Sequence, residues 1–161
     1  MSELIHEFGE LHPVFVHFPI ALIVTAALAE ALYMIRRSQW LGDAARFMIA
    51  AGAWAAVPAV AAGFAEASAE TFVGGTARLF SVHWVCGVVT AVLAFLAYGL
   101  GEGTRRSGQV WEQALYRIFL LMAAAGAMIT SFFGASLAHA EGAAETGSVE
   151  FGLTVMTHFW Y

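Results

Sequence analysis

The sequence predicts an all-α integral membrane protein, a four-helix bundle with up-down-up-down topology. Of its 161 residues, 60% are hydrophobic and only 12% are charged, and the mean hydropathy is +0.74. A soluble domain of this length is less apolar. Because one crossing of the hydrocarbon core takes roughly 20 apolar residues, four crossings with their loops and tails use nearly the whole chain. We therefore expect a single transmembrane domain over residues 1–161.

Four apolar runs supply the expected helices, and each is close to the length that a membrane span requires. They cover residues 14–35, 47–64, 80–100 and 115–137. The first run is expected to stay in the mature protein rather than to be cleaved as a signal peptide, because acidic residues precede it and no A-x-A site follows. Charged or glycine-rich breaks predict loops, and an outer C-terminal tail follows the last run. These segments are residues 36–39, 68–76, 101–108 and 138–161.

The second run is distinguished by its small residues. Alanine and glycine occur on every face of it, which lets neighbouring backbones approach closely. Pro19 and Pro58 fall inside the first and second runs, where a missing backbone hydrogen bond favours a kink. The second and fourth runs end in similar stretches, residues 63–70 and 134–141, which indicates a repeated hairpin.

The arginines indicate the orientation, because short loops rich in positive charge stay in the cytoplasm. All seven cations are arginine, and six of them flank the first and third loops: Arg36, Arg37, Arg46, Arg105, Arg106 and Arg117. The opposite side holds Arg78 and most of the glutamates. Both termini are therefore expected on the periplasmic side of a bacterial inner membrane. The net charge of −5 and the lack of a polybasic tail argue against nucleic acid as a partner.

Ionisable side chains from all four helices lie at one predicted depth. Counting about 1.5 Å of rise per residue from the inner arginines places His17 about 28 Å, Glu66 about 30 Å, and His83 and His139 about 33 Å away, all on the outer side. His12 lies one to two turns further out, where it either begins a helix or joins the layer as a fifth member. Since ionisable groups inside a membrane often mark function, we interpret this layer as a polar site near the outer face.

Several neutral imidazoles at one depth favour metal ligation, because helical bundles build cofactor sites from side chains on facing helices. One histidine from each of two helices is enough for bis-histidine ligation of a b-type haem. The single cysteine and the lack of a C-x-x-C-H motif mean that such a haem is held without covalent linkage. Zinc-hydrolase H-E-x-x-H and repeated di-iron Glu-x-x-His motifs are also missing. Copper is the alternative, because Cys86 shares a helix face with His83, and both could join His17 and His139 in a nitrogen–sulfur site.

The segment His12-Pro13-Val14-Phe15-Val16-His17-Phe18-Pro19-Ile20 resembles the HPxxVHFPI opening of a bacterial membrane-protein family catalogued as domain of unknown function 2231. The resemblance covers most of the chain. That family is also similar in its four helices, in an early histidine of the third helix, matched by His83, and in a glycine-then-histidine end, matched by Gly134 and His139. Similar domains occur beside cytochromes, so the resemblance implies haem and electron transfer. Glu66 rests on the depth count alone.

Our first hypothesis is a cytochrome b-like electron-transfer subunit rather than a stand-alone enzyme. His17 with His83 or His139 would ligate one haem b, and His12 with the remaining histidine would ligate a second. Such a subunit would pass electrons between a periplasmic cytochrome and quinone, or to a larger membrane redox complex. The alternatives are a non-redox accessory subunit whose histidines only form hydrogen bonds, and a copper or proton-handling protein that uses the same layer.

Overall fold

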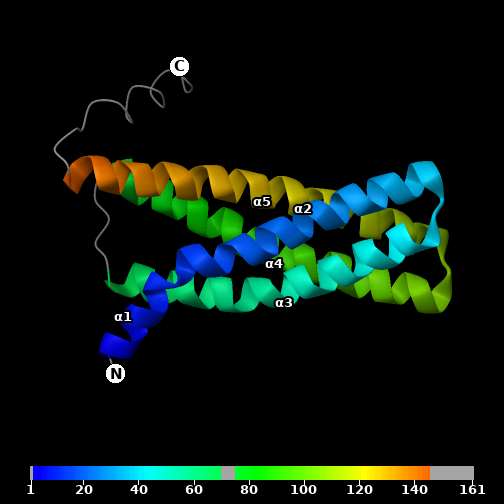
Figure 1. The fold of residues 1–161 in the computed structure, drawn as a ribbon, viewed down its shortest axis with the longest axis horizontal. Coiled ribbons are helices and arrows are strands. Elements are labelled where there is room, and N and C mark those ends of the chain that lie inside the picture. The colour runs from blue at the N-terminus through cyan, green and yellow to red at the C-terminus, as the bar shows by residue number, and fades with distance from the viewer. Residues whose placement is uncertain (1, 70–74, 146–161) are drawn as a thin grey trace, which may run out of the picture.

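The computed structural model describes residues 2–69 and 75–145, and these parts of the chain are helical with short turns between the helices (Figure 1). A short helix precedes four long ones: α1 (Ser2–Glu10), α2 (His12–Arg36), α3 (Gln39–Ala69), α4 (Gly75–Ser107) and α5 (Val110–Glu145). The long helices run up and down along one axis, and each is long and apolar enough to cross a membrane. The predicted fold class, an all-α four-helix membrane bundle, is confirmed.

The helices extend further than the apolar runs that predict them. α4 continues through residues 101–107, where the sequence predicts a loop, and α5 continues through residues 138–145, where it predicts a tail. The rest of that tail, residues 146–161, lies outside the described residues. α1 is an additional helix that none of the apolar runs predicts. The apolar count stops at the first charged residues, whereas a helix satisfies its own backbone hydrogen bonds in the headgroup layer as well.

Two tight turns close the hairpins at the arginine-rich end of the bundle. The first follows α2 at Arg37, a left-handed residue with φ 54° whose N–H donates to the Tyr33 carbonyl at 2.8 Å. The second follows α4 at Gly108, also left-handed with φ 65°, whose N–H donates to the Thr104 carbonyl at 2.9 Å. A left-handed residue directly after a helix satisfies one of its last carbonyls, which lets the chain reverse within a few residues.

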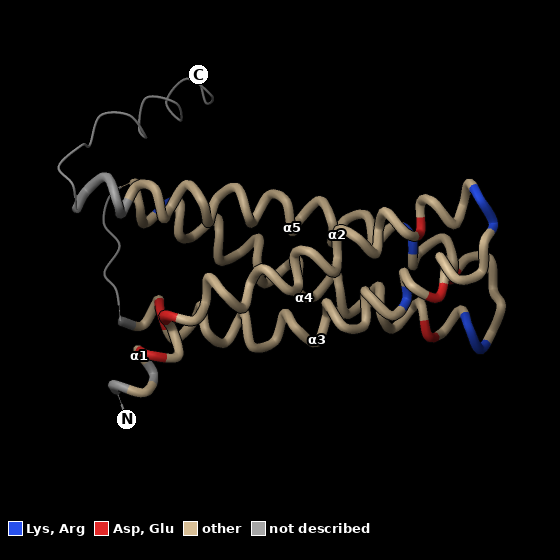
Figure 2. Tube along the Cα trace, viewed as in Figure 1, with Lys and Arg blue, Asp and Glu red and all other residues tan. Residues whose placement is uncertain are grey.

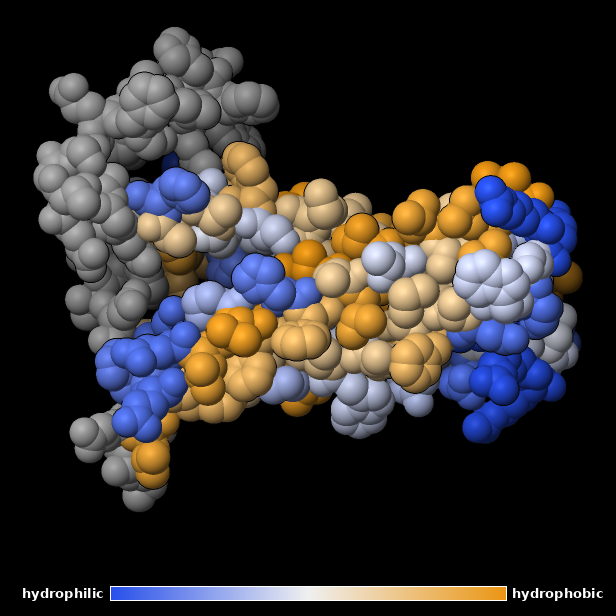
Figure 3. Space-filling view, viewed as in Figure 1, coloured by the Kyte–Doolittle hydropathy of each residue, from blue (hydrophilic) through white to orange (hydrophobic). Residues whose placement is uncertain are grey.

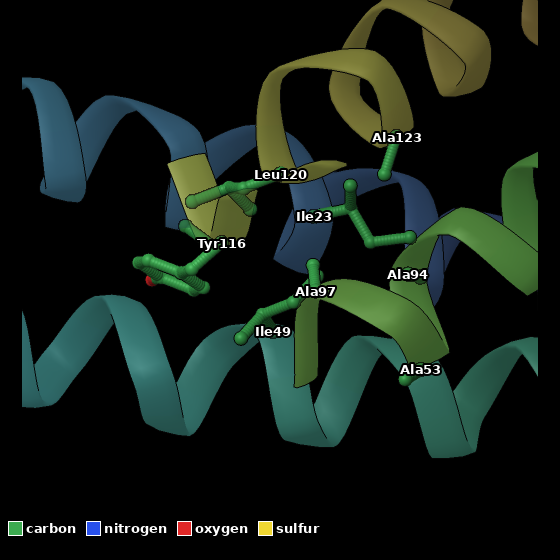
Figure 4. Packing of buried hydrophobic residues seen from close by; sticks show 9 residues of the cluster. Ile23, Ile49, Ala53, Ala94, Ala97, Tyr116, Leu120 and Ala123 are labelled. Atoms are coloured by element: carbon green, nitrogen blue, oxygen red, sulfur yellow. The ribbon is translucent and has the colours of Figure 1, made fainter. Parts of the chain in front are cut away.

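Small side chains allow close packing at the centre of the bundle (Figure 4). α2 packs mainly on α3 and α4 mainly on α5, and the two hairpins meet where α2 contacts α5 and α3 contacts α4. Alanines fill the gaps between a few larger side chains in this core: Ile23, Ala26, Ile49, Ala53, Ala94, Ala97, Tyr116, Leu120 and Ala123. Lipid tails are as apolar as leucine, so helices in a membrane associate through close contact rather than through the hydrophobic effect.

The outer surface of the bundle is apolar along its middle and polar at its ends. Large side chains near the middle of their helices, such as Trp54 and Met128, are 61% and 59% exposed, as expected where lipid is the solvent. Figure 3 shows the apolar middle of one face, with hydrophilic residues at either end. Most of the described arginines gather at the end that holds the two tight turns, and the acidic residues of α1 lie at the other (Figure 2).

We expect Ala53→Leu to lower the free energy of unfolding by about 1–3 kcal/mol, because the larger side chain has no room in the packed centre. Ala53 has no exposed surface. Thermal unfolding of the purified protein in detergent measures the effect. Ala61→Leu is the matched control, since it makes the same change on the exposed side of α3 and should shift the unfolding midpoint little. Equal midpoints for the two variants would contradict the packing described above.

Candidate cofactor site

Two histidine rings lie next to each other near the α1 end of the bundle. The ring centroids of His12 and His83 are 6.2 Å apart, and the ring planes cross at 86°. Both side chains are half-buried. Because His12 is on α2 and His83 is on α4, the ring pair bridges the two hairpins.

Each ring is held by the other helix of its own hairpin. Nδ1 of His12 lies 2.9 Å from the Ala59 carbonyl of α3, and Nδ1 of His83 lies 3.0 Å from the Thr130 carbonyl of α5. A carbonyl oxygen can only accept, so Nδ1 must carry the proton and donate it in both hydrogen bonds. The other nitrogen, Nε2, then holds a lone pair in each neutral ring. In each ring, Nε2 is therefore the nitrogen that can accept a hydrogen bond or a bond to a metal.

A glycine opposite each ring makes room for it. A Cβ atom on Gly63 would lie 2.9 Å from Cε1 of His12, and one on Gly134 would lie 2.8 Å from Cε1 of His83. Both approaches are too short for any side chain, so each ring occupies the space that its glycine leaves open. Nε2 is the ring nitrogen further from the glycine in both cases, at 3.5 Å and 3.7 Å.

Each histidine, with the carbonyl that it bonds to and the glycine opposite its ring, forms one half-site. The two half-sites are related by a repeat in the sequence. The hydrogen-bonded pairs His12–Ala59 and His83–Thr130 are both separated by 47 residues. Each glycine, Gly63 or Gly134, follows four residues after its carbonyl. One constant shift of 71 residues thus carries the first half-site onto the second. The repeat indicated by the similar helix ends therefore includes the histidines.

A cavity of about 610 Å³ lies between the four long helices and includes both rings in its wall. Ligand pockets are commonly roughly 300–1,000 Å³. The rest of the wall is largely apolar and comes from every long helix, with Pro19, Ala56, Trp84 and Ala127 among its residues. The cavity is therefore large enough for a cofactor and offers it a mostly apolar environment.

Two further residues of the predicted layer, His17 and Glu66, also line the cavity. His17 is exposed, and its Nδ1 donates to the Pro13 carbonyl of its own helix. Glu66 is half-buried on α3, where α1 crosses closely: a Cβ on Gly9 would lie 2.7 Å from the Glu66 backbone nitrogen. These two residues are neighbours of the ring pair in the cavity wall rather than members of it.

The remaining two predicted residues lie elsewhere. His139 is exposed and its Nδ1 donates to the Ala135 carbonyl of its own helix at 2.7 Å. Cys86 is half-buried in a separate groove of about 310 Å³ between α4 and α5, beside Met122 and Gly126. Within the described residues, no three His, Cys, Asp or Glu side chains come close enough to hold a metal ion. The copper site with His17, His83, Cys86 and His139 stays a prediction.

The depth count ranks the histidines differently from the structure. Counting rise alone joins His17 to His83, whereas the rings that meet are those of His12 and His83. His12 and His17 are five residues apart, which turns them about 140° relative to each other around the helix. The sequence does contain a usable signal: the same spacing separates each histidine from a glycine in the second helix of its hairpin.

Comparison with known sequences identifies one family. The sequence model of the family described as "Predicted membrane protein (DUF2231)" matches residues 10–147. The match begins just before the HPxxVHFPI segment and continues beyond Gly134, so it includes both half-sites. No curated protein and no solved structure matches the chain.

Gly63→Ala and Gly134→Ala are each expected to lower the free energy of unfolding by about 1–3 kcal/mol, because the new methyl group collides with a histidine ring. Thermal unfolding in detergent measures this change. Gly99→Ala is the control: a Cβ there meets nothing within 4 Å, and alanine is the better helix former. Combining Gly134→Ala with His83→Ala removes the collision and should recover part of the loss. Identical behaviour of Gly134→Ala and Gly99→Ala would show that the ring does not occupy this position.

Proposed function

The chain belongs to the family of predicted membrane proteins described as DUF2231, and we propose that it is an electron-transfer subunit that holds a b-type haem between His12 and His83. The observation that carries this proposal is the ring pair, in which both imidazoles are fixed through Nδ1 and keep Nε2 for a ligand. When bound, the haem supplies one-electron redox chemistry.

The ring pair fits ligation of one metal by both histidines. Bis-histidine ligation would take one imidazole from each of two facing helices, and His12 and His83 would hold the haem iron in this way. Their ring centroids lie 6.2 Å apart. The hydrogen bonds to Ala59 and Thr130 have the role of the outer partners found at most metal-ligating histidines, which fix the tautomer and the ring orientation and raise the basicity of the ligating nitrogen.

One haem is favoured over two in this proposal. Of the two remaining histidines of the layer, His17 lines the cavity and His139 does not, so the two are not placed to share a second haem there. Haem is likewise favoured over copper, because Cys86 lies in a different groove from the ring pair. His17 and Glu66 remain near the ring pair as polar groups of the cavity wall, where they can bind the polar edge of a ligand.

The arginine distribution indicates which membrane face the proposed site lies near. With the arginine-rich turns in the cytoplasm, the ring pair lies near the periplasmic face of the bacterial inner membrane. A site at that depth is accessible to a periplasmic cytochrome and, from the bilayer, to quinone. We therefore assign the protein to a membrane redox complex that exchanges electrons near its outer surface.

The absorption spectrum of the purified protein tests the proposal. We expect a Soret band that shifts on reduction with dithionite, together with resolved α and β bands. His12→Ala and His83→Ala should each lower the haem content at least about tenfold, since even outer-shell changes weaken metal sites by 10–100-fold. His139→Ala is the control and should keep the spectrum.

The possible outcomes separate the hypotheses. A colourless, metal-free preparation from haem-sufficient cells would overturn both the haem and the copper proposals and leave the accessory subunit. A haem spectrum that survives both His12→Ala and His83→Ala would reject this ligand pair.

Orientation is tested by cysteine labelling in a Cys86→Ser background. Glu7→Cys lies on exposed α1, and Ser107→Cys lies on an exposed position at the end of α4. A membrane-impermeant maleimide applied to spheroplasts should label the first, and should label the second only after the membrane is opened. The reverse pattern would place the ring pair on the cytoplasmic side.

A further inference from the structure

A buried polar cluster occupies the arginine-rich end of the bundle, opposite the histidine pair. Glu30 of α2 is only 3% exposed, and its Oε1 accepts hydrogen bonds from Arg117 Nε at 2.8 Å and Gln113 Nε2 at 3.2 Å, both on α5. Arg46 of α3 and Tyr116 of α5 complete the cluster, and Tyr116 has no exposed surface. The cluster therefore joins the first hairpin to the second by an ion pair.

Three polar atoms of this cluster are buried without a hydrogen-bond partner among the described residues: Glu30 Oε2, Arg46 Nε and Tyr116 Oη. Native proteins satisfy nearly all such atoms, either with a protein partner or with an ordered water. An unpaired donor or acceptor loses its hydration without compensation. Three such atoms on three different helices therefore indicate that one common partner satisfies them.

The three side chains occupy one neighbourhood. A Cβ on Gly101 of α4 would lie 3.3 Å from Cε2 of Tyr116 and 4.0 Å from Cγ of Arg46, so both side chains pack over this glycine. Tyr116 also interacts electrostatically with Glu30, Arg46 and Arg117. Figure 4 shows the Tyr116 ring on the α3-facing side of α5, with its oxygen pointing away from the alanine-rich core.

The charges of the cluster select a neutral ligand. Arg46 and Arg117 repel a cation, and Glu30 repels an anion. The three unpaired atoms comprise one certain donor, Arg46 Nε–H, one hydroxyl, and one acceptor, Glu30 Oε2. A water molecule accepts from the guanidinium and the hydroxyl and donates to the carboxylate. Buried waters typically form about three hydrogen bonds to otherwise unsatisfied groups.

We infer that an ordered water is bound between Glu30 Oε2, Arg46 Nε and Tyr116 Oη and forms part of the joint between the two hairpins. This site is independent of any haem, because it lies at the other end of the bundle from the histidine pair. It satisfies the second oxygen of a carboxylate whose first oxygen is already paired with Arg117.

Tyr116→Phe tests the inference by the sign of its effect in the full chain, purified in detergent. If the hydroxyl binds the water, its removal should lower the thermal midpoint by about 2–4 °C. If the hydroxyl is truly unpaired, phenylalanine removes a buried polar group at no loss and the midpoint stays or rises, which would overturn the inference. Tyr98→Phe, on half-buried Tyr98 of α4, controls for the loss of a tyrosine hydroxyl elsewhere.

Glu30→Gln supplies a second test through the same water. In the Glu30→Gln background, Tyr116→Phe should shift the midpoint less than in the wild type, because the water has already lost its carboxylate acceptor. Strictly additive shifts would contradict a shared ligand. A crystal structure that resolves ordered solvent decides the case where Glu30→Gln does not fold. A peak within about 2.7–3.2 Å of all three atoms supports the site, and direct pairing among them overturns it.

Discussion

Close approach of the helices is the constraint on which the rest of this structure depends. In hydrocarbon there is no hydrophobic force between helices, so the bundle must gain its stability from contacts at short range. Ala26, Ala53, Ala97 and Ala123 supply those contacts at the centre, where none of them has exposed surface. The same principle acts at the histidines, since Gly63 and Gly134 bring α3 and α5 near enough for each ring to reach a backbone carbonyl. The packing of the centre and the placement of the histidine rings thus have one physical cause.

The two ends of the bundle use the internal repeat differently. At the histidine end the repeat is kept, since His12 and His83 form matching hydrogen bonds in the two hairpins. At the arginine-rich end, Arg46 and Arg117 are related by the same shift of 71 residues, but Glu30 is related to Gly101. The second hairpin therefore has no acid at the position that corresponds to Glu30, and Gly101 leaves the space in which Tyr116 and Arg46 pack. The histidine end therefore keeps the repeat and contains the cavity, whereas the arginine-rich end departs from the repeat and is packed with side chains.

The sequence predicts correctly the features that depend on composition, such as the number of long helices. It does not predict the contacts that depend on how each helix is rotated about its axis. Four apolar runs were enough for the number and order of the long helices, because the bilayer fixes their length and character. The ends of α4 and α5 were underestimated, because charged residues end an apolar run without ending a helix. His17 and His12 show the same limit at the site: depth follows from counting residues, whereas contact also needs the direction of each side chain and the tilt of each helix. The ion pair of Glu30 with Arg117 likewise joins two different helices, so it depends on helix rotation and not on spacing along one helix.

The location of the ring pair between the hairpins has a mechanical consequence. His12 is anchored to α3 and His83 to α5, so each imidazole moves with its own hairpin. The hairpins are joined at the far end by the Glu30–Arg117 ion pair, which lies in a low-dielectric, largely buried setting where such a contact is strong only if its geometry is kept. A ligand bound by both rings would join the same two bodies at the opposite end. With the proposed ligand held by both rings, occupancy of the cavity would be coupled to the relative position of the hairpins, because each imidazole is anchored within its own hairpin.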